Sequence, residues 1–138
     1  MKDSNGWAET FQQAAAALPL PRPTITLAEL TDLDNRFWVM FWDIYRLLLR
    51  GDSAKSFPIY LQLTHFTLSR LIELLPVGNS LRQTLAQVRF GPDNQTNIQQ
   101  MNSLLHTYIQ ARQFIVLHFN LPFTPNRAFE DEIRRRLK

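Results

Sequence analysis

Three histidines are the residues of this chain whose side chains are best suited to metal binding or acid–base chemistry. They are His65, His106 and His118, and none lies at a metal-ligand spacing from another histidine or from a carboxylate. His106 and His118 are twelve residues apart, near one helical face, but two ligands do not make a metal site. We therefore expect structural or surface histidines, no metal and no cofactor.

Other catalytic patterns are missing from the sequence as well. The chain has no cysteine, which excludes disulfides, thiolate metal ligands and thiol catalysis. The four glycines are isolated, so there is no glycine-rich phosphate loop, and no Gly-x-Ser-x-Gly nucleophile motif is present. The close carboxylates fall at a predicted helix start or among predicted ion pairs, where their roles are structural. The sequence predicts a protein that is not an enzyme, and it offers no catalytic residue.

Arginines in the middle of the chain could bind the phosphate groups of RNA or DNA. Residues 53–129 hold six basic residues against two acids, and the whole chain has a net charge of +3. Two of these arginines are seven residues apart, so they share one face of a predicted short helix, with many glutamines and asparagines nearby. The alternative is a neutral, solvated surface that happens to lack acids. The candidate nucleic-acid contacts are Arg82, Arg89, Arg112 and Arg127.

Aromatic side chains point instead to a protein partner. The segment 36–50 carries large apolar side chains in nearly every direction around a helix, and such a helix must be covered on all sides. Tryptophan, tyrosine and arginine are the residue types that most often anchor protein interfaces. Aromatic residues make up 12% of the chain, more than a simple helical bundle of this size needs. The candidate residues for contact with a second copy or another protein are Trp7, Phe11, Trp38, Trp42, Tyr45, Leu49, Phe129 and Ile133.

Helices are predicted to position all of these residues. The first spans about 4–17 and precedes three prolines between residues 19 and 23, which form either a rigid linker or an extended recognition segment. The second begins at a capping box of Thr26 and Glu29 and stops at Gly51. The remaining helices are expected at about 57–75, 80–90 and 96–120 and near the end of the chain, with the respective caps Ser56, Ser80, Thr96 and Thr124.

The predicted fold class is all-α, because no segment alternates apolar and polar residues in the way that strands do. We expect a single compact bundle of five to six helices around a central helix at about 27–50. Residues 1–25 would form an N-terminal helix plus Pro-rich linker, and residues 26–138 the helical domain. One side of the central helix leaves a question open. This side is formed by Trp38, Trp42, Tyr45 and Leu49. If the helix at 57–75 covers this side, the protein is a plain bundle. If that helix does not cover it, a partner binds there.

Charge and hydropathy along the chain bear on the last helix and on the location of the protein. Three consecutive acids, residues 130–132, each precede an arginine by four residues, which predicts a self-neutralised helix rather than a phosphate-binding tail. The N-terminus is polar, and no apolar run approaches the roughly 18 residues that would span a bilayer. We therefore expect no signal peptide and no membrane span, with the cytoplasm as the default location.

Together these patterns predict a non-enzymatic, all-α interaction subunit or adaptor that acts within an oligomer or a larger assembly. No small-molecule ligand is predicted. The alternative, from a different class, is a small helical nucleic-acid-binding protein that contacts RNA or DNA through the basic middle of the chain, as a subunit of a nucleoprotein complex. Binding that weakens steeply with salt would distinguish the second hypothesis from the first.

Overall fold

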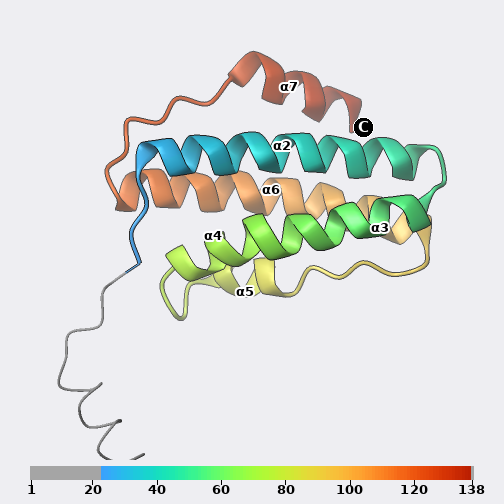
Figure 1. Cartoon of the computed structure of the whole chain (residues 1–138), viewed down its shortest axis with the longest axis horizontal. Coiled ribbons are helices and arrows are strands. Elements are labelled where there is room, and N and C mark those ends of the chain that lie inside the picture. Colours follow the sequence, from blue (N-terminus) through green and yellow to red (C-terminus); the bar gives the residue numbers. More distant parts are fainter. Residues whose placement is uncertain (1–22, 138) are drawn as a thin grey trace, which may run out of the picture.

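Every element in the described part of the chain is a helix (Figure 1). The computed structural model describes residues 23–137, so the predicted helix at 4–17 lies outside the described residues. The helices are α2 (Leu27–Leu49), α3 (Ser53–Gln62), the π-helical segment η1 (Leu63–Leu68), α4 (Ser69–Leu74), α5 (Ser80–Ala86), α6 (Asn94–His118) and α7 (Arg127–Arg136). The all-α prediction is confirmed for this part of the chain. None of these helices is long and apolar enough to cross a membrane.

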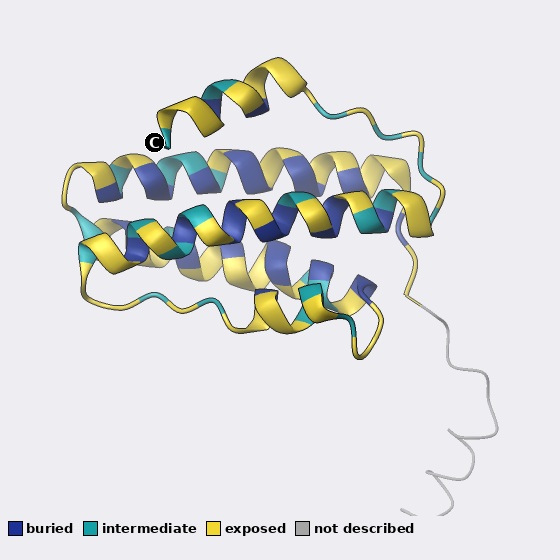
Figure 2. Cartoon of the chain, turned by 180° about the vertical axis from the view of Figure 1, so that it is seen from behind, coloured by how far each residue is buried: buried dark blue, intermediate teal, exposed yellow. Residues whose placement is uncertain are grey.

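Three long rods form the body of the fold. α3, η1 and α4 follow one another without a break in helical backbone, so they make one rod that runs back along α2. α6 lies beside α2 and returns in the opposite direction, and the short α5 packs against α4 and α6. α7 lies along the outer side of α2, on the edge of the molecule away from α5 (Figures 1 and 2).

The core lies between the three rods, where the buried residues face one another (Figure 2). The inner face of α2 is closed to solvent because large apolar residues recur along it at helical spacing. The ring of Phe37 stacks on that of Tyr108 from α6, with ring centroids 3.5 Å apart and planes within 3° of parallel. The other fully buried residues of this face of α2 are Leu30, Phe41, Ile44 and Leu48.

Most helix starts differ from the predicted ones, because aspartate and asparagine act as caps where serine or threonine was expected. Only the Thr26 cap is confirmed: its hydroxyl accepts a hydrogen bond from the backbone amide of Glu29 at 3.1 Å. The other four predicted caps are wrong by one to four residues, because an Asp or Asn oxygen nearby reaches the first free amides equally well. The observed caps are Asp52 for α3, Asn79 for α5, Asp93 for α6 and Asn126 for α7.

The C-terminal end of α2 lies where the sequence predicted it, just before Gly51. Gly51 adopts a φ of +77°, a left-handed conformation that disfavours residues with a Cβ, and its amide donates to the carbonyl of Leu48. This turn reverses the chain so that α3 can pack along α2.

The cap of α7 can be tested with two substitutions. Asn126→Ala removes the oxygen that accepts a hydrogen bond from the amide of Phe129 at 3.2 Å, so it should lower the free energy of unfolding by about 1 kcal/mol. Thr124→Ala, at the cap expected from the sequence, should change it by less than about 0.5 kcal/mol. Urea denaturation of the two variants measures both values, and an equal loss in both would contradict the assignment of Asn126 as the cap.

Candidate functional site

Most of the predicted interface residues meet where α7 packs on α2. The indole ring of Trp38 contacts the ring of Phe129 edge to face, with centroids 5.9 Å apart, and the hydroxyl of Tyr45 donates to the carbonyl of Leu137 at 3.4 Å. The guanidinium of Arg136 lies over the ring of Trp42. The side of α2 that the sequence left open is therefore covered mainly by α7 of the same chain.

This contact divides the predicted interface residues into two groups. Trp38, Tyr45 and Ile133 are buried, which corrects their expected place on a partner-binding surface, because α7 packs on this side of α2. Leu49 and Phe129 keep 57% and 45% of their surface exposed, and Trp42 is half-buried, so their role in an interface stays a prediction; Trp7 and Phe11 lie outside the described residues.

A buried charged cluster joins α2, α6 and α7. Arg112, only 5% exposed, donates through Nη1 to Oδ1 of Asp34 at 2.9 Å and to Oε2 of Glu130 at 2.8 Å. Its Nη2 donates to Oε1 of Glu130 at 2.8 Å. The same Asp34 oxygen accepts from Nε1 of Trp38 at 3.2 Å and from the hydroxyl of Tyr108. A charge taken out of water in this way must be paired and hydrogen-bonded, and here each charge is.

The protonation states of the cluster suit a structural role. Burial alone would lower the pKa of Arg112, but the hydrogen bonds to Glu130 and Asp34 outweigh it and raise that pKa above its usual value. Burial, together with the negative charge of Asp34, raises the pKa of Tyr108 well above its usual value. Both groups therefore keep their protons at neutral pH, and neither is poised to exchange one with a substrate.

The four candidate nucleic-acid contacts do not form one surface. Arg112 lies in the core, which corrects its expected place among surface arginines, because two carboxylates neutralise it. Arg82 is half-buried and donates to the carbonyl of Leu75 at 3.2 Å. Arg89 is exposed and lies just after α5, whereas the exposed Arg127 begins α7 on the opposite edge of the molecule (Figure 1).

The ion pairs of α7 also differ from the sequence prediction. Glu132 pairs with Arg136 at 3.1 Å as expected, but it also pairs with Arg135, which was expected to pair with Asp131. Glu130 turns inward to Arg112 instead of pairing along the helix with Arg134. As a result, Arg134 forms no ion pair within residues 23–137, and the helix is not fully self-neutralised.

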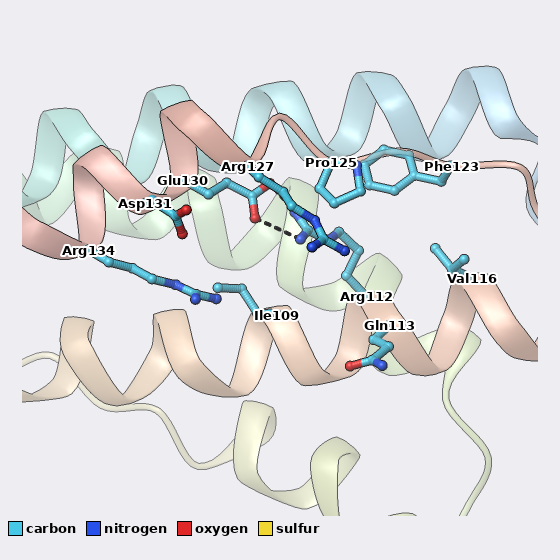
Figure 3. A pocket seen from close by; sticks show the side chains of 10 residues that line it. All are labelled: Ile109, Arg112, Gln113, Val116, Phe123, Pro125, Arg127, Glu130, Asp131 and Arg134. Carbon is cyan, nitrogen blue, oxygen red and sulfur yellow. Dashed lines mark hydrogen bonds and ion pairs between the residues drawn. The ribbon is translucent and has the colours of Figure 1, made fainter.

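Two hollows stand out on the surface. One, of about 400 Å³, lies between α6 and α7 over the buried cluster and is lined by charged and apolar side chains (Figure 3). The other, of about 590 Å³, lies between the start of α3 and the loop before α6 and is mostly apolar. Its lining residues are Ser53, Ala54, Phe57, Phe90, Gly91 and Pro92; we call it the α3 groove.

The α3 groove has fixed walls. The buried Asn97 donates through its amide to the carbonyl of Gly91 at 2.7 Å and accepts from the amide of Gly91 at 2.9 Å. The hydroxyl of Tyr60 donates to the carbonyl of Val88 at 3.1 Å, and its ring stacks on that of Phe90. These bonds hold the loop of residues 87–93 against α3, so the groove exists before any partner arrives.

Phe57 lines the α3 groove, and Leu61 lies one turn further along α3; neither was among the interface candidates from the sequence. They are 43% and 49% exposed and lie four residues apart, so they share one face of α3. The signal in the sequence was a helix that is apolar on more than one side, but the sequence alone could not show which side faces the solvent.

All three histidines are exposed, and no group of three possible metal-ligating side chains occurs among the described residues.

No family model matches the chain, and comparisons with curated proteins and with solved structures also gave no match.

The buried tyrosine gives the protein a testable pH dependence. The pKa of Tyr108 is raised in the folded state, so its contribution to stability is fully present below the unfolded value of about 10 and is lost as pH rises through the folded pKa. Tyr108→Phe removes this contribution. In urea denaturation, the stability difference between wild type and Tyr108→Phe should therefore shrink above about pH 10. A difference that stays constant up to about pH 11 would contradict a buried, hydrogen-bonded tyrosine here.

Proposed function

We propose that this chain is a non-enzymatic interaction subunit, a single helical bundle built around α2 that binds another protein through the α3 groove. The partner is either a second copy of the chain or a different protein. The observation that carries the proposal is a preformed apolar hollow lined by the exposed Phe57, with a second exposed apolar side chain, Leu61, on the same face of α3.

The chemistry of the groove suits a protein partner. Interface energy concentrates in a few apolar or aromatic side chains that fill a pocket, with polar residues around them. The α3 groove offers the aromatic rings of Phe57 and Phe90, whose centroids are 5.9 Å apart, and the flat side of Pro92. Because Asn97 already fixes the loop, a partner would not have to order it, which lowers the entropic cost of binding.

A second apolar surface supports a role in a larger assembly. Leu49 and Phe129 are exposed near the C-terminal half of α2, and a hollow of about 260 Å³ lies beside Trp42, Phe129 and Ile133. This surface involves α7, whereas the α3 groove involves α3 and the loop before α6. Two separate contact surfaces are what an adaptor needs to join more than two chains.

Nucleic-acid binding remains the second proposal, because residues 94–129 contain no acid and Arg89 and Arg127 are exposed. Its support is weaker than the sequence suggested, since Arg112 is neutralised in the core and Arg82 and Arg89 already bond to backbone carbonyls.

Self-association through the α3 groove can be measured by light scattering. The wild-type chain should form a dimer or a larger species. Phe57→Glu/Leu61→Glu should weaken that association more than about tenfold, because it places carboxylates on the exposed apolar face of α3 beside the groove. A matched control, Gln95→Glu/Gln99→Glu, adds the same charge at exposed positions of α6 and should associate like wild type.

The results also separate the two kinds of partner. A wild type that stays monomeric at all concentrations would exclude the second copy. Affinity capture with wild type and with both double variants then tests a different partner. Equal capture by the groove variant and the control would contradict the α3 groove as the binding surface.

The second proposal predicts steeply salt-dependent binding to RNA or DNA. Arg82→Ala/Arg89→Ala should weaken binding at low salt and reduce the salt dependence by about two phosphate contacts. Fluorescence anisotropy with single- and double-stranded oligonucleotides measures both. Absence of binding at low salt would remove this function.

A further inference from the structure

We propose that the hollow between α6 and α7 is a binding site for a small organic carboxylate attached to a flat apolar body. The site differs from the α3 groove in place and in chemistry, so it goes beyond the proposed function. Its hydrogen-bond donors come from Arg112 at the base and from Arg127 and Arg134 on α7 (Figure 3).

The guanidinium of Arg112 has one unused binding edge. It carries five N–H donors, and three of them are taken by Asp34 and Glu130. Both protons of Nη1 and one proton of Nη2 are used, so the remaining two donors are Nε–H and the second N–H of Nη2. These two lie parallel on one edge of the group and form the second fork that binds a carboxylate through two hydrogen bonds. No acceptor among residues 23–137 occupies that edge.

Arg127 and Arg134 bring two further guanidinium groups to the hollow. They are seven residues apart, two turns along α7, and both line the hollow. Neither forms an ion pair within the described part of the chain; the reason for Arg134 is that Glu130 is engaged by Arg112. Figure 3 shows Arg134 reaching from α7 toward Ile109 of α6, across the hollow. Gln113 adds an amide from the α6 side.

The charge balance disfavours a ligand with two negative charges. The three arginines at the hollow are matched by three carboxylates: Asp34 and Glu130 behind Arg112, and Asp131 on the wall. A dianion such as a phosphate monoester would meet no net positive charge. A carboxylate gains from directed hydrogen bonds while adding the smallest repulsion, and Asp131 can accept a hydrogen bond from a hydroxyl or amine on the same ligand.

The rest of the wall is apolar, so the part of the ligand beyond its carboxylate should be apolar too. Phe123 and Pro125 come from the segment between α6 and α7, and Ile109 and Val116 from α6. The ring of Phe123 lies 5.4 Å from Cζ of Arg112, so it covers one face of the guanidinium. A hollow of about 400 Å³ is within the size range of small-molecule sites, and an inorganic ion would leave its apolar wall unused.

Benzoate is a suitable probe, because it joins one carboxylate to a flat apolar ring. The full-length ¹⁵N-labelled chain is titrated with benzoate, and the arginine Nε–H signals are followed by NMR. The Arg112 Nε–H signal should shift in a saturable way. Arg127→Gln/Arg134→Gln should raise the Kd at least about tenfold, the loss expected for one charge-assisted hydrogen bond. Arg135→Gln, which removes an arginine paired with Glu132 outside the hollow, should change the Kd less than about twofold.

Three further probes make the test decisive. Benzamide keeps the ring without the charge, and acetate keeps the charge without the ring, so both should bind at least about tenfold more weakly than benzoate. Benzamide binding as tightly as benzoate, an equal loss in Arg135→Gln, or no saturable shift with benzoate would each overturn the proposal. Inorganic phosphate binding more tightly than benzoate would overturn it as well, since the site would then prefer the dianion.

Discussion

The buried ion pairs of Arg112 are the interaction on which the arrangement of the helices depends. Arg112 lies on α6 and its guanidinium binds Asp34 of α2 and Glu130 of α7, so one group joins three helices, of which α2 is far from the other two in sequence. Losing Arg112 would leave two carboxylates in the core without their ion-pair partner, and breaking a buried pair in this way typically costs about 3–5 kcal/mol. The cluster also explains why α7 adopts one position: its apolar stripe could slide along α2, but a bidentate pair fixes its register.

The helical class of residues 23–137 and the bounds of α2 agree with the sequence prediction, because both depend on periodicity. Apolar spacing and the Thr26 cap located α2 to within one residue at each end. The other helix starts were missed because serine, threonine, aspartate and asparagine compete for the same role over a few residues. Local pattern cannot choose among them when the tertiary contacts that decide lie elsewhere in the chain.

The interior of the candidate site was harder to predict, although a signal was present. Arg112 lies on the apolar stripe of α6, which runs through Met101, Leu105, Tyr108 and Ile115. Asp34 likewise lies among the buried residues of α2, and Glu130 lies one turn before Ile133. Charged residues on three apolar faces could have indicated a shared buried pair. Which acid would meet which base could not be predicted, since that depends on how the helices pack.

The long sequence separation within the buried cluster has a consequence for how the chain folds. Asp34 and Arg112 are 78 residues apart, and Glu130 follows 18 residues later. During synthesis, the guanidinium of Arg112 lacks its Glu130 partner, and the ring of Trp38 its contact with Phe129, until α7 has been made. The rods can collapse earlier through their apolar faces, so the charged cluster closes late and commits the molecule to its final arrangement. A chain that stalls before that step exposes the side of α2 that holds Trp38 and Trp42 to chaperones and to other chains.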